Sequence, residues 1–147
     1  MKQYVVLLAT EDSAVEASVR ALTTRADCRL NCVKTSREAL SIVMDEAMDG
    51  FFDEDMVLVD LDLAGGCRAL LRTAGGSLPV IAMAGKEKPW LSGMLRHQCI
   101  QATLTKPVSL GALSAAFDRV RRTPRGSAAS STAFGANEFP ATASLCV

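Results

Sequence analysis

Acidic and basic side chains follow three short apolar runs of the 147-residue chain, at the points where those runs stop. Thr10, Glu11 and Asp12 come after the first run, Asp60 ends another, and Lys106 follows the last. If the runs are parallel strands, these side chains meet at one edge of a sheet, where open α/β sheets bind ligands. Carboxylates gathered there repel one another unless a cation lies between them, and oxygen ligands of this type suit Mg²⁺. With a lysine to hold an anion, such a set indicates an aspartyl-phosphate site.

The order of apolar and amphipathic segments predicts the elements that position these residues. Short apolar runs alternate with amphipathic stretches, which is typical of an α/β protein with a parallel sheet. The strands are expected at residues 5–9, 28–32, 56–59, 78–84 and about 100–105. Five strand–helix units then fit within residues 1–122.

Capping residues predict where the helices begin and end. Ser13 with Glu16, and Thr35 with Glu38, both fit the capping box, and Gly50 is placed to end the second helix. The apolar positions expected to face the core in these two helices are Val15, Val19, Leu22, Leu40, Val43, Met44 and Ala47. A short third helix is expected to carry Cys67, Leu70 and Leu71 and to close at Gly75 and Gly76.

The fourth and last helices are predicted from the second half of the chain. Pro89 suits the first turn of a fourth helix that carries Trp90. Ser109 is expected to cap the last helix, whose C-terminal arginines lie where the helix dipole favours cations. Its apolar positions with helical spacing are Leu110, Leu113, Phe117 and Val120.

Composition narrows the class of protein. Hydrophobic residues make up 49% of the chain, which is enough for the core of one domain. Lys and Arg number 16, as do Asp and Glu, so there is no basic excess of the kind that nucleic-acid binding requires. No apolar stretch approaches the ~18 residues of a membrane span. The five scattered cysteines include no C-x-x-C pair and are expected to be buried thiols in a reducing cytoplasm.

Two segments differ from the rest of the chain. Residues 45–55 contain six acids, which we interpret as a solvated helix end and loop. In residues 123–147, 17 of the 25 residues are Ala, Ser, Thr, Gly or Pro. That segment cannot bury enough apolar area to offset its chain entropy, so a disordered tail is expected after the domain of residues 1–122.

Residues 3–122 resemble the receiver domain of bacterial two-component response regulators, of which CheY is the single-domain example. The resemblance rests on four motifs in order: Glu11-Asp12, Val57-Leu58-Val59-Asp60, Leu78-Pro79-Val80-Ile81-Ala82-Met83, and Leu104-Thr105-Lys106-Pro107. It implies a doubly wound α/β fold with five parallel strands in the order 2-1-3-4-5 and helices on both faces of the sheet.

The resemblance also assigns roles to individual residues. It implies that Asp60 accepts a phosphoryl group from the phosphohistidine of a kinase. Glu11 and Asp12 would hold Mg²⁺ together with Asp60, and the backbone carbonyl of Asp62 would complete the protein ligands. Lys106 would pair with the phosphate.

The chain departs from the receiver pattern at several of these positions. The usual acidic pair falls on Thr10 and Glu11, so one carboxylate is lost unless Asp12 replaces it, and metal affinity should be reduced. Ala84 stands where receivers carry the Ser or Thr that senses the phosphoryl group, and Thr103 stands at the aromatic switch position. Gly85, by contrast, retains the small residue beside the phosphate.

The partners follow from the same resemblance. A histidine kinase or a histidine phosphotransfer protein would supply phosphate. A downstream protein, or a second copy in a homodimer, would bind the face formed by the fourth helix, the fifth strand and the last helix, where Trp90 is a candidate anchor. Pro107 would set the turn into that last helix through a cis bond.

Three functions remain as alternatives. In the first, the chain is a phosphorylatable single-domain receiver with an altered switch, and not an enzyme that turns over a substrate. In the second, it is a degenerate receiver that binds a protein partner without phosphate. The third is a phosphatase of the haloacid-dehalogenase type, since Asp60 and Asp62 form a D-x-D motif, but only Asp118 and Glu138 remain as acids after Lys106.

Overall fold

The computed structural model describes residues 3–63, 65–75, 77–85 and 100–122, which form one parallel sheet between two helical layers. The strands are β1 (Val5–Ala9), β2 (Arg29–Val33), β3 (Met56–Asp60), β4 (Val80–Ala84) and β5 (Ala102–Thr105). The helices are α1 (Ser13–Arg25), α2 (Ser36–Asp49), α3 (Arg68–Gly75) and α5 (Leu110–Arg122).

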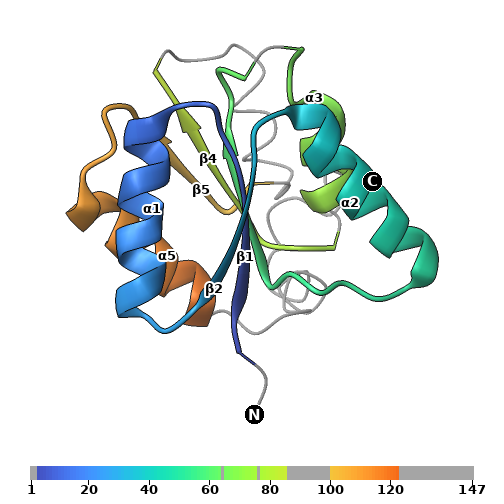
Figure 1. The fold of residues 1–147 in the computed structure, drawn as a ribbon, viewed down its shortest axis with the longest axis horizontal. Coiled ribbons are helices and arrows are strands. Elements are labelled where there is room, and N and C mark those ends of the chain that lie inside the picture. The colour runs from blue at the N-terminus through green and yellow to red at the C-terminus, as the bar shows by residue number, and fades with distance from the viewer. Residues whose placement is uncertain (1–2, 64, 76, 86–99, 123–147) are drawn as a thin grey trace, which may run out of the picture.

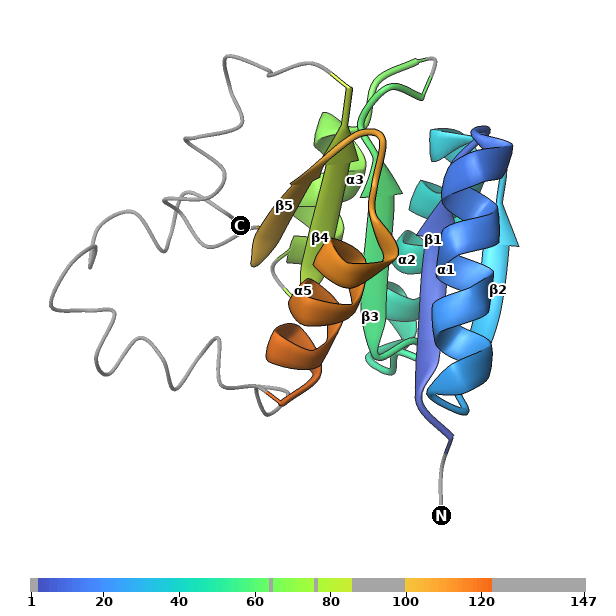
Figure 2. The same ribbon diagram turned by 90° about the vertical axis from the view of Figure 1, so that its left-hand side faces the viewer.

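The strand order is β2-β1-β3-β4-β5, and every neighbouring pair is parallel. Helices α1 and α5 cover one face of this sheet, and α2 and α3 cover the other (Figure 1). All strands therefore end at the same edge, as the arrowheads show in Figure 2. The predicted doubly wound α/β fold with strand order 2-1-3-4-5 is confirmed.

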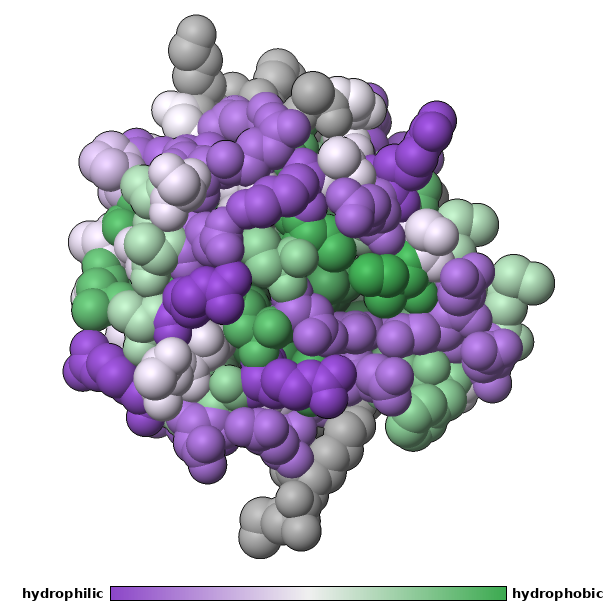
Figure 3. All heavy atoms as spheres, in the orientation of Figure 1, coloured by the Kyte–Doolittle hydropathy of each residue, from purple (hydrophilic) through white to green (hydrophobic). Residues whose placement is uncertain are grey.

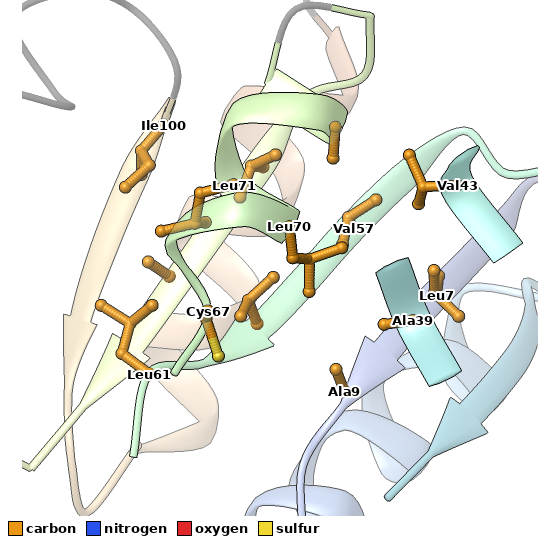
Figure 4. Packing of buried hydrophobic residues seen from close by; sticks show 14 of the residues in the cluster. Leu7, Ala9, Ala39, Val43, Val57, Leu61, Cys67, Leu70, Leu71 and Ile100 are labelled. Atoms are coloured by element: carbon orange, nitrogen blue, oxygen red, sulfur yellow. The ribbon is translucent and has the colours of Figure 1, made fainter. Parts of the chain in front are cut away.

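The core explains why three of the strands are continuous apolar runs. Strands β1, β3 and β4 are buried along their whole length, because helices cover both faces of the central sheet. On one face, Leu7 and Val57 of the sheet pack with Val43 of α2 and with Leu70 and Leu71 of α3 (Figure 4). The other face packs against α1 and α5, around the fully buried Phe117.

The helix caps confirm two predictions and correct one. Thr35 caps α2 and accepts from the backbone N–H of Glu38, and Ser109 Oγ accepts from the backbone N–H of Ala112 in α5. The prediction that Ser13 caps α1 is wrong: the cap is Asp12, whose carboxylate accepts from two backbone N–H groups. The carboxylate of Asp12 reaches these groups because its own backbone is extended, whereas Ser13 already belongs to the helix.

The predicted core stripe of α2 holds only in the first part of the helix. Val43 is fully buried and Leu40 packs against the core, but Met44 is 47% exposed and Ala47 is also exposed. In Figure 1 the C-terminal end of α2 extends away from the sheet, so Met44 and Ala47 do not lie over it. In α5, Leu110 is likewise exposed, while the other three predicted positions are buried.

Several predictions lie outside the described residues: the fourth helix with Pro89 and Trp90, the tail of residues 123–147, and the thiols of Cys99 and Cys146. Of the other cysteines, Cys28 and Cys67 are buried and Cys32 is partly buried, all as free thiols. Within the described ranges no helix combines the length and the apolar character that a membrane span needs.

Two acids of the segment 45–55 are not solvated as predicted. Glu54 is only 3% exposed, and Glu46 of α2 shares a side-chain hydrogen bond with it. Burial, followed by the hydrogen bond and charge of Glu54, raises the pKa of Glu46 to about 8. One oxygen of each carboxyl group finds no hydrogen-bond partner in the described part of the chain. Glu46 therefore holds a proton at neutral pH, which lets the two carboxyl groups lie side by side.

This pair predicts that Glu46→Gln stabilises the protein at pH 7.5 and not at pH 4.5. The folded protein binds a proton at Glu46 between about pH 4.5 and pH 8, and the unfolded chain does not, so stability falls as the pH rises through this window. A neutral amide removes that loss, which at about 1.4 kcal/mol per pH unit amounts to about 4 kcal/mol at most between these two pH values. Urea unfolding at both pH values measures it.

Glu38→Gln, an exposed acid on the same helix, is the matched control and should show no such pH-dependent gain. An equal gain from Glu46→Gln at both pH values would contradict a proton held by this pair.

Candidate functional site

The sheet register brings the predicted site residues to one edge. Ala9 of β1 lies beside Val59 of β3, so that Thr10 comes next to Asp60. Lys106 follows β5, two strands away from β3, or about 10 Å in a sheet with ordinary spacing. Its backbone N–H donates to the carbonyl of Ala84 at the end of β4, and its long side chain reaches Asp60 from there.

Asp60 is buried, and hydrogen-bond donors surround its carboxylate. It is only 3% exposed. The Thr10 hydroxyl donates to Oδ2 at 2.7 Å, and the backbone N–H of Asp62 donates to Oδ1 at 3.0 Å. Lys106 Nζ lies 2.8 Å from both carboxylate oxygens. A buried carboxylate requires such pairing, since its desolvation would otherwise cost several kcal/mol.

Lys106 contacts three carboxylates. Besides Asp60, its Nζ lies 3.2 Å from Asp62 Oδ2 and 3.6 Å from Asp12 Oδ2. One ammonium thus faces three acids, which leaves an excess of two negative charges at this edge. The hydrogen bonds to Asp60 and Asp62 overcome the effect of burial, which by itself would lower the pKa of Lys106, and raise that pKa above its usual value. The lysine is therefore a permanent cation at neutral pH.

The loops on either side of Asp60 are tied to the same cluster. Asp62 Oδ2 accepts from the backbone N–H of Gly85 at 2.8 Å. A Cβ atom at position 85 would lie 3.3 Å from that oxygen, a tight contact, so a glycine suits the close approach of the two loops. Hydrogen bonds from the backbone N–H groups of Ala14 and Val15, with a smaller effect of Lys106, lower the pKa of Asp12.

Among the predicted metal ligands, Asp12, Asp60 and Asp62 come together and Glu11 does not. The side chain of Glu11 is exposed and forms no hydrogen bond or ion pair with the residues that the structure describes. The backbone carbonyl of Asp62 was the predicted ligand, but the contacts of this residue in the cluster come from its side chain and its N–H.

The donor chemistry of the cluster fits Mg²⁺, whose preferred protein ligands are a few hard oxygen atoms beside water. In this structure, however, the ammonium of Lys106 occupies the position between the carboxylates. Within residues 3–63, 65–75, 77–85 and 100–122 no three acidic, cysteine or histidine side chains are grouped as metal ligands. A metal would have to compete with Lys106 for these oxygens.

The two positions that the resemblance assigns to the switch lie on β4 and β5. Ala84 is 7% exposed at the end of β4 and offers only a methyl group there. Thr103 is exposed on β5. The Lys106–Pro107 peptide bond is cis, as predicted for the turn that leads to α5.

The role of Thr10 was missed by the sequence analysis. The alignment with receivers treated Thr10 as a lost acid, yet its hydroxyl is fully buried and bonds both Asp60 and the backbone N–H of Asp12. The signal in the sequence was a threonine directly after a buried strand, at the level where the neighbouring strand ends in an aspartate.

Comparison with solved structures identifies the fold. The signal receiver domain of an HD domain-containing protein from Pseudomonas fluorescens Pf-5 is similar over 81% of this chain and 94% of its own, with a TM-score of 0.67 and 17% identity. A CheY-like response regulator receiver domain from Methanospirillum hungatei JF-1 gives 0.66 and 19% identity, over 80% and 93% of the chains. The chain has the receiver-domain fold.

A third solved structure has the same fold. The receiver domain of the sensor histidine kinase PA1611 from Pseudomonas aeruginosa PAO1, described with a magnesium ion in its active-site cleft, has a TM-score of 0.60 and 18% identity. It matches 81% of this chain and 98% of its own. No family model and no curated protein matches the sequence.

The geometry at Asp60 predicts a large effect of removing the lysine charge. In Lys106→Met, three carboxylates remain at this edge without a cation, and one of them is buried. Breaking a buried pair in this way costs about 3–5 kcal/mol. Urea unfolding at pH 7 should show a loss of this size, and the second change Asp60→Asn should recover part of it.

Lys34→Met provides the matched control, because the ion pair of Lys34 with Glu16 is on the surface. Exposed pairs contribute about 0–1 kcal/mol. Equal losses in the two lysine variants would show that the Asp60 cluster does not depend on Lys106.

Proposed function

We propose that the chain is a response-regulator receiver domain that accepts a phosphoryl group on Asp60 from the phosphohistidine of a kinase or phosphotransfer protein. The observation that carries this proposal is the buried Asp60 carboxylate with Lys106 Nζ 2.8 Å away, at the carboxyl edge of the sheet. This pairing supplies an acceptor oxygen together with a fixed cation beside the group that it would receive.

In the proposed transfer, a carboxylate oxygen of Asp60 attacks the phosphorus atom. The bond between phosphorus and the imidazole nitrogen breaks, its electron pair stays on that nitrogen, and an aspartyl phosphate forms. Lys106 would release the attacking oxygen and pair with the phosphoryl oxygens. Thr10 and the N–H of Asp62 hold the carboxylate in a fixed orientation, which favours an in-line approach.

Mg²⁺ fits this function as a weakly bound cofactor. Asp12 and Asp60 would hold it, and the bound ion would neutralise charge on the transferred phosphoryl group. Asp12 is the better candidate than Glu11, because it already contacts the cluster through Lys106. The excess of two negative charges supports binding of a divalent cation, whereas competition with Lys106 makes the affinity low.

The decisive experiment is phosphorylation by a small phosphodonor. Acetyl phosphate with Mg²⁺ should add one phosphoryl group to the purified chain, measured by intact mass, and Asp60→Asn should abolish the addition. The matched control Asp118→Asn, an exposed acid on α5, should be phosphorylated as the unchanged chain is. A mass gain that survives Asp60→Asn would refute Asp60 as the acceptor. Release of phosphate with turnover would instead favour the phosphatase alternative.

A change at position 10 tests the reduced metal affinity. Thr10→Asp restores a second carboxylate beside Asp60 and should tighten Mg²⁺ binding about tenfold or more, measured by calorimetry. Thr24→Asp adds the same charge at an exposed position near the end of α1 and should leave the affinity unchanged. Equal gains in both variants would point to a general charge effect and not to the Asp60 cluster.

A second candidate function is that of a receiver that binds its partner without phosphate. Two observations favour it: Thr10 and Lys106 already engage both oxygens of Asp60, and Ala84 has no hydroxyl with which to sense a phosphoryl group. Partner binding that survives in Asp60→Asn, together with no mass gain from acetyl phosphate, would support this function over phosphotransfer.

A further inference from the structure

A second surface with a distinct composition lies at the C-terminal end of α2. Among the described residues, four large apolar side chains are exposed, and three of them fall within eight residues: Met44 (47%), Met48 (85%) and Phe51 (62%). Met44 and Met48 are four residues apart and so lie on one face of the helix. Figure 3 shows hydrophobic and hydrophilic side chains side by side over this end of the molecule. We call Met44, Met48 and Phe51 the methionine face.

The backbone holds this face in a defined shape. Gly50 ends α2 in the left-handed conformation, with φ of 76°, and its N–H donates to the carbonyl of Ala47. The N–H of Phe51 donates to the carbonyl of Glu46 at 3.1 Å. These two bonds form the Schellman motif, which turns Phe51 back beside the last turn of the helix. The backbone that carries Phe51 is therefore held against the last turn of α2.

Negative charge surrounds the methionine face. Asp45 and Asp49 are exposed on α2, and Asp53 is exposed just after it. The last turn of α2 contains no basic residue, although the helix dipole favours cations there. Residues 45–55, which include this end of the helix, contain six acids and no Lys, Arg or His. This arrangement repels anions and weakens the helix end, so it is best explained by a cationic partner.

We propose that the methionine face binds a basic amphipathic helix of a partner protein. The apolar side of such a helix packs on Met44, Met48 and Phe51, and its lysines and arginines pair with Asp45 and Asp49. Unbranched methionine side chains adapt to differently shaped apolar partners. A helix docked through regularly spaced apolar anchors is a common mode of peptide recognition.

Two occupants from the chain itself fit the face less well. Residues 123–147 contain only one basic residue, Arg125, and one acid, so that segment cannot complement the acidic rim. A second copy would offer the basic end of α5, but its Arg121 lies over the rings of Tyr4 and Phe117, 4.9 Å and 5.8 Å from their centroids. A separate cationic helix matches the charge of the rim without breaking these contacts.

This surface and the Asp60 site are independent. Helix α2 starts at the edge where the strands end, so its C-terminal end lies at the opposite edge of the sheet (Figure 1). Binding to the methionine face thus requires neither phosphate nor Asp60, and Asp60→Asn should leave it unchanged. A failure here would not weaken the proposed phosphotransfer, and failure of phosphotransfer would not weaken this proposal.

The test uses the full-length chain and a fluorescein-labelled peptide of roughly 18 residues, with leucine every third or fourth position and lysine elsewhere. Fluorescence anisotropy at pH 7.5 should detect binding, and amide chemical shifts should change in residues 40–52. Met48→Ser should weaken binding about tenfold, as loss of a central apolar contact does. The matched control Leu110→Ser, an exposed leucine on α5, should bind as the unchanged chain does.

A charge test separates this docking from simple apolar adhesion. The double variant Asp45→Lys, Asp49→Lys should lose affinity for the lysine peptide, and a peptide with glutamate in place of each lysine should not bind the unchanged chain. Equal binding to Met48→Ser and Leu110→Ser, or equal binding of both peptides, would overturn the proposal. A dimer that Met48→Ser disrupts in sedimentation would overturn it in favour of self-association. Shifts of the amides of residues 123–147 on Met48→Ser would do so in favour of the tail.

Discussion

The fold buries the carboxylate of Asp60 at the end of an apolar strand, and most of the surrounding architecture follows from the need to compensate that charge. A carboxylate in this position requires donors from several directions. The parallel sheet supplies them, because its strands end at one edge: Thr10 comes from β1, Lys106 from the end of β5, and the N–H of Asp62 from the following loop. The strand order therefore places the hydroxyl of Thr10 on one side of Asp60, next to β3, and brings Lys106 from the other side, two strands away.

The need to compensate the buried charge of Asp60 also explains how a threonine fits at position 10, where receivers carry an acid. With a threonine at position 10, the Asp60 carboxylate gains a hydrogen bond in place of a neighbouring charge, and the repulsion at this edge is smaller than with a second acid. Lys106 can then sit between Asp12, Asp60 and Asp62 as an internal cation. An external divalent ion would be correspondingly less needed for the fold, which would link the lost acid to the weak metal binding that we propose.

The sequence predicted the strands, because burial on both faces leaves a continuous apolar run, and it placed Thr10, Asp60 and Lys106 at one edge, because a strand end leaves a polar residue. The strand order was implied by the resemblance to receiver domains. It did not predict contacts that depend on three-dimensional proximity. Asp12 caps α1 because its backbone is extended. The sequence offered Ser13, one residue later, as an equally suitable capping residue, and the backbone angle that decides between them cannot be read from the sequence. The pairing of Glu46 with Glu54 joins a helix end to a loop eight residues later, and a count of acids gives no sign of it. Helical periodicity placed Met44 on the apolar face of α2, but periodicity does not show how far the sheet extends under the helix, and Met44 is exposed.

The two acidic regions of the chain are stabilised in different ways, and this difference bears on what each can bind. At the Asp60 edge a lysine neutralises part of the charge, so the proposed phosphoryl group would meet a cation that is already in place. At the end of α2 no basic side chain is present in the last turn, and only a proton on Glu46 relieves the repulsion with Glu54. The acids beside Met48, Asp45 and Asp49, are exposed to solvent. The proposed phosphoryl group would therefore meet a lysine held among three acids, whereas a basic partner at the end of α2 would meet exposed acids with no basic side chain in the last turn.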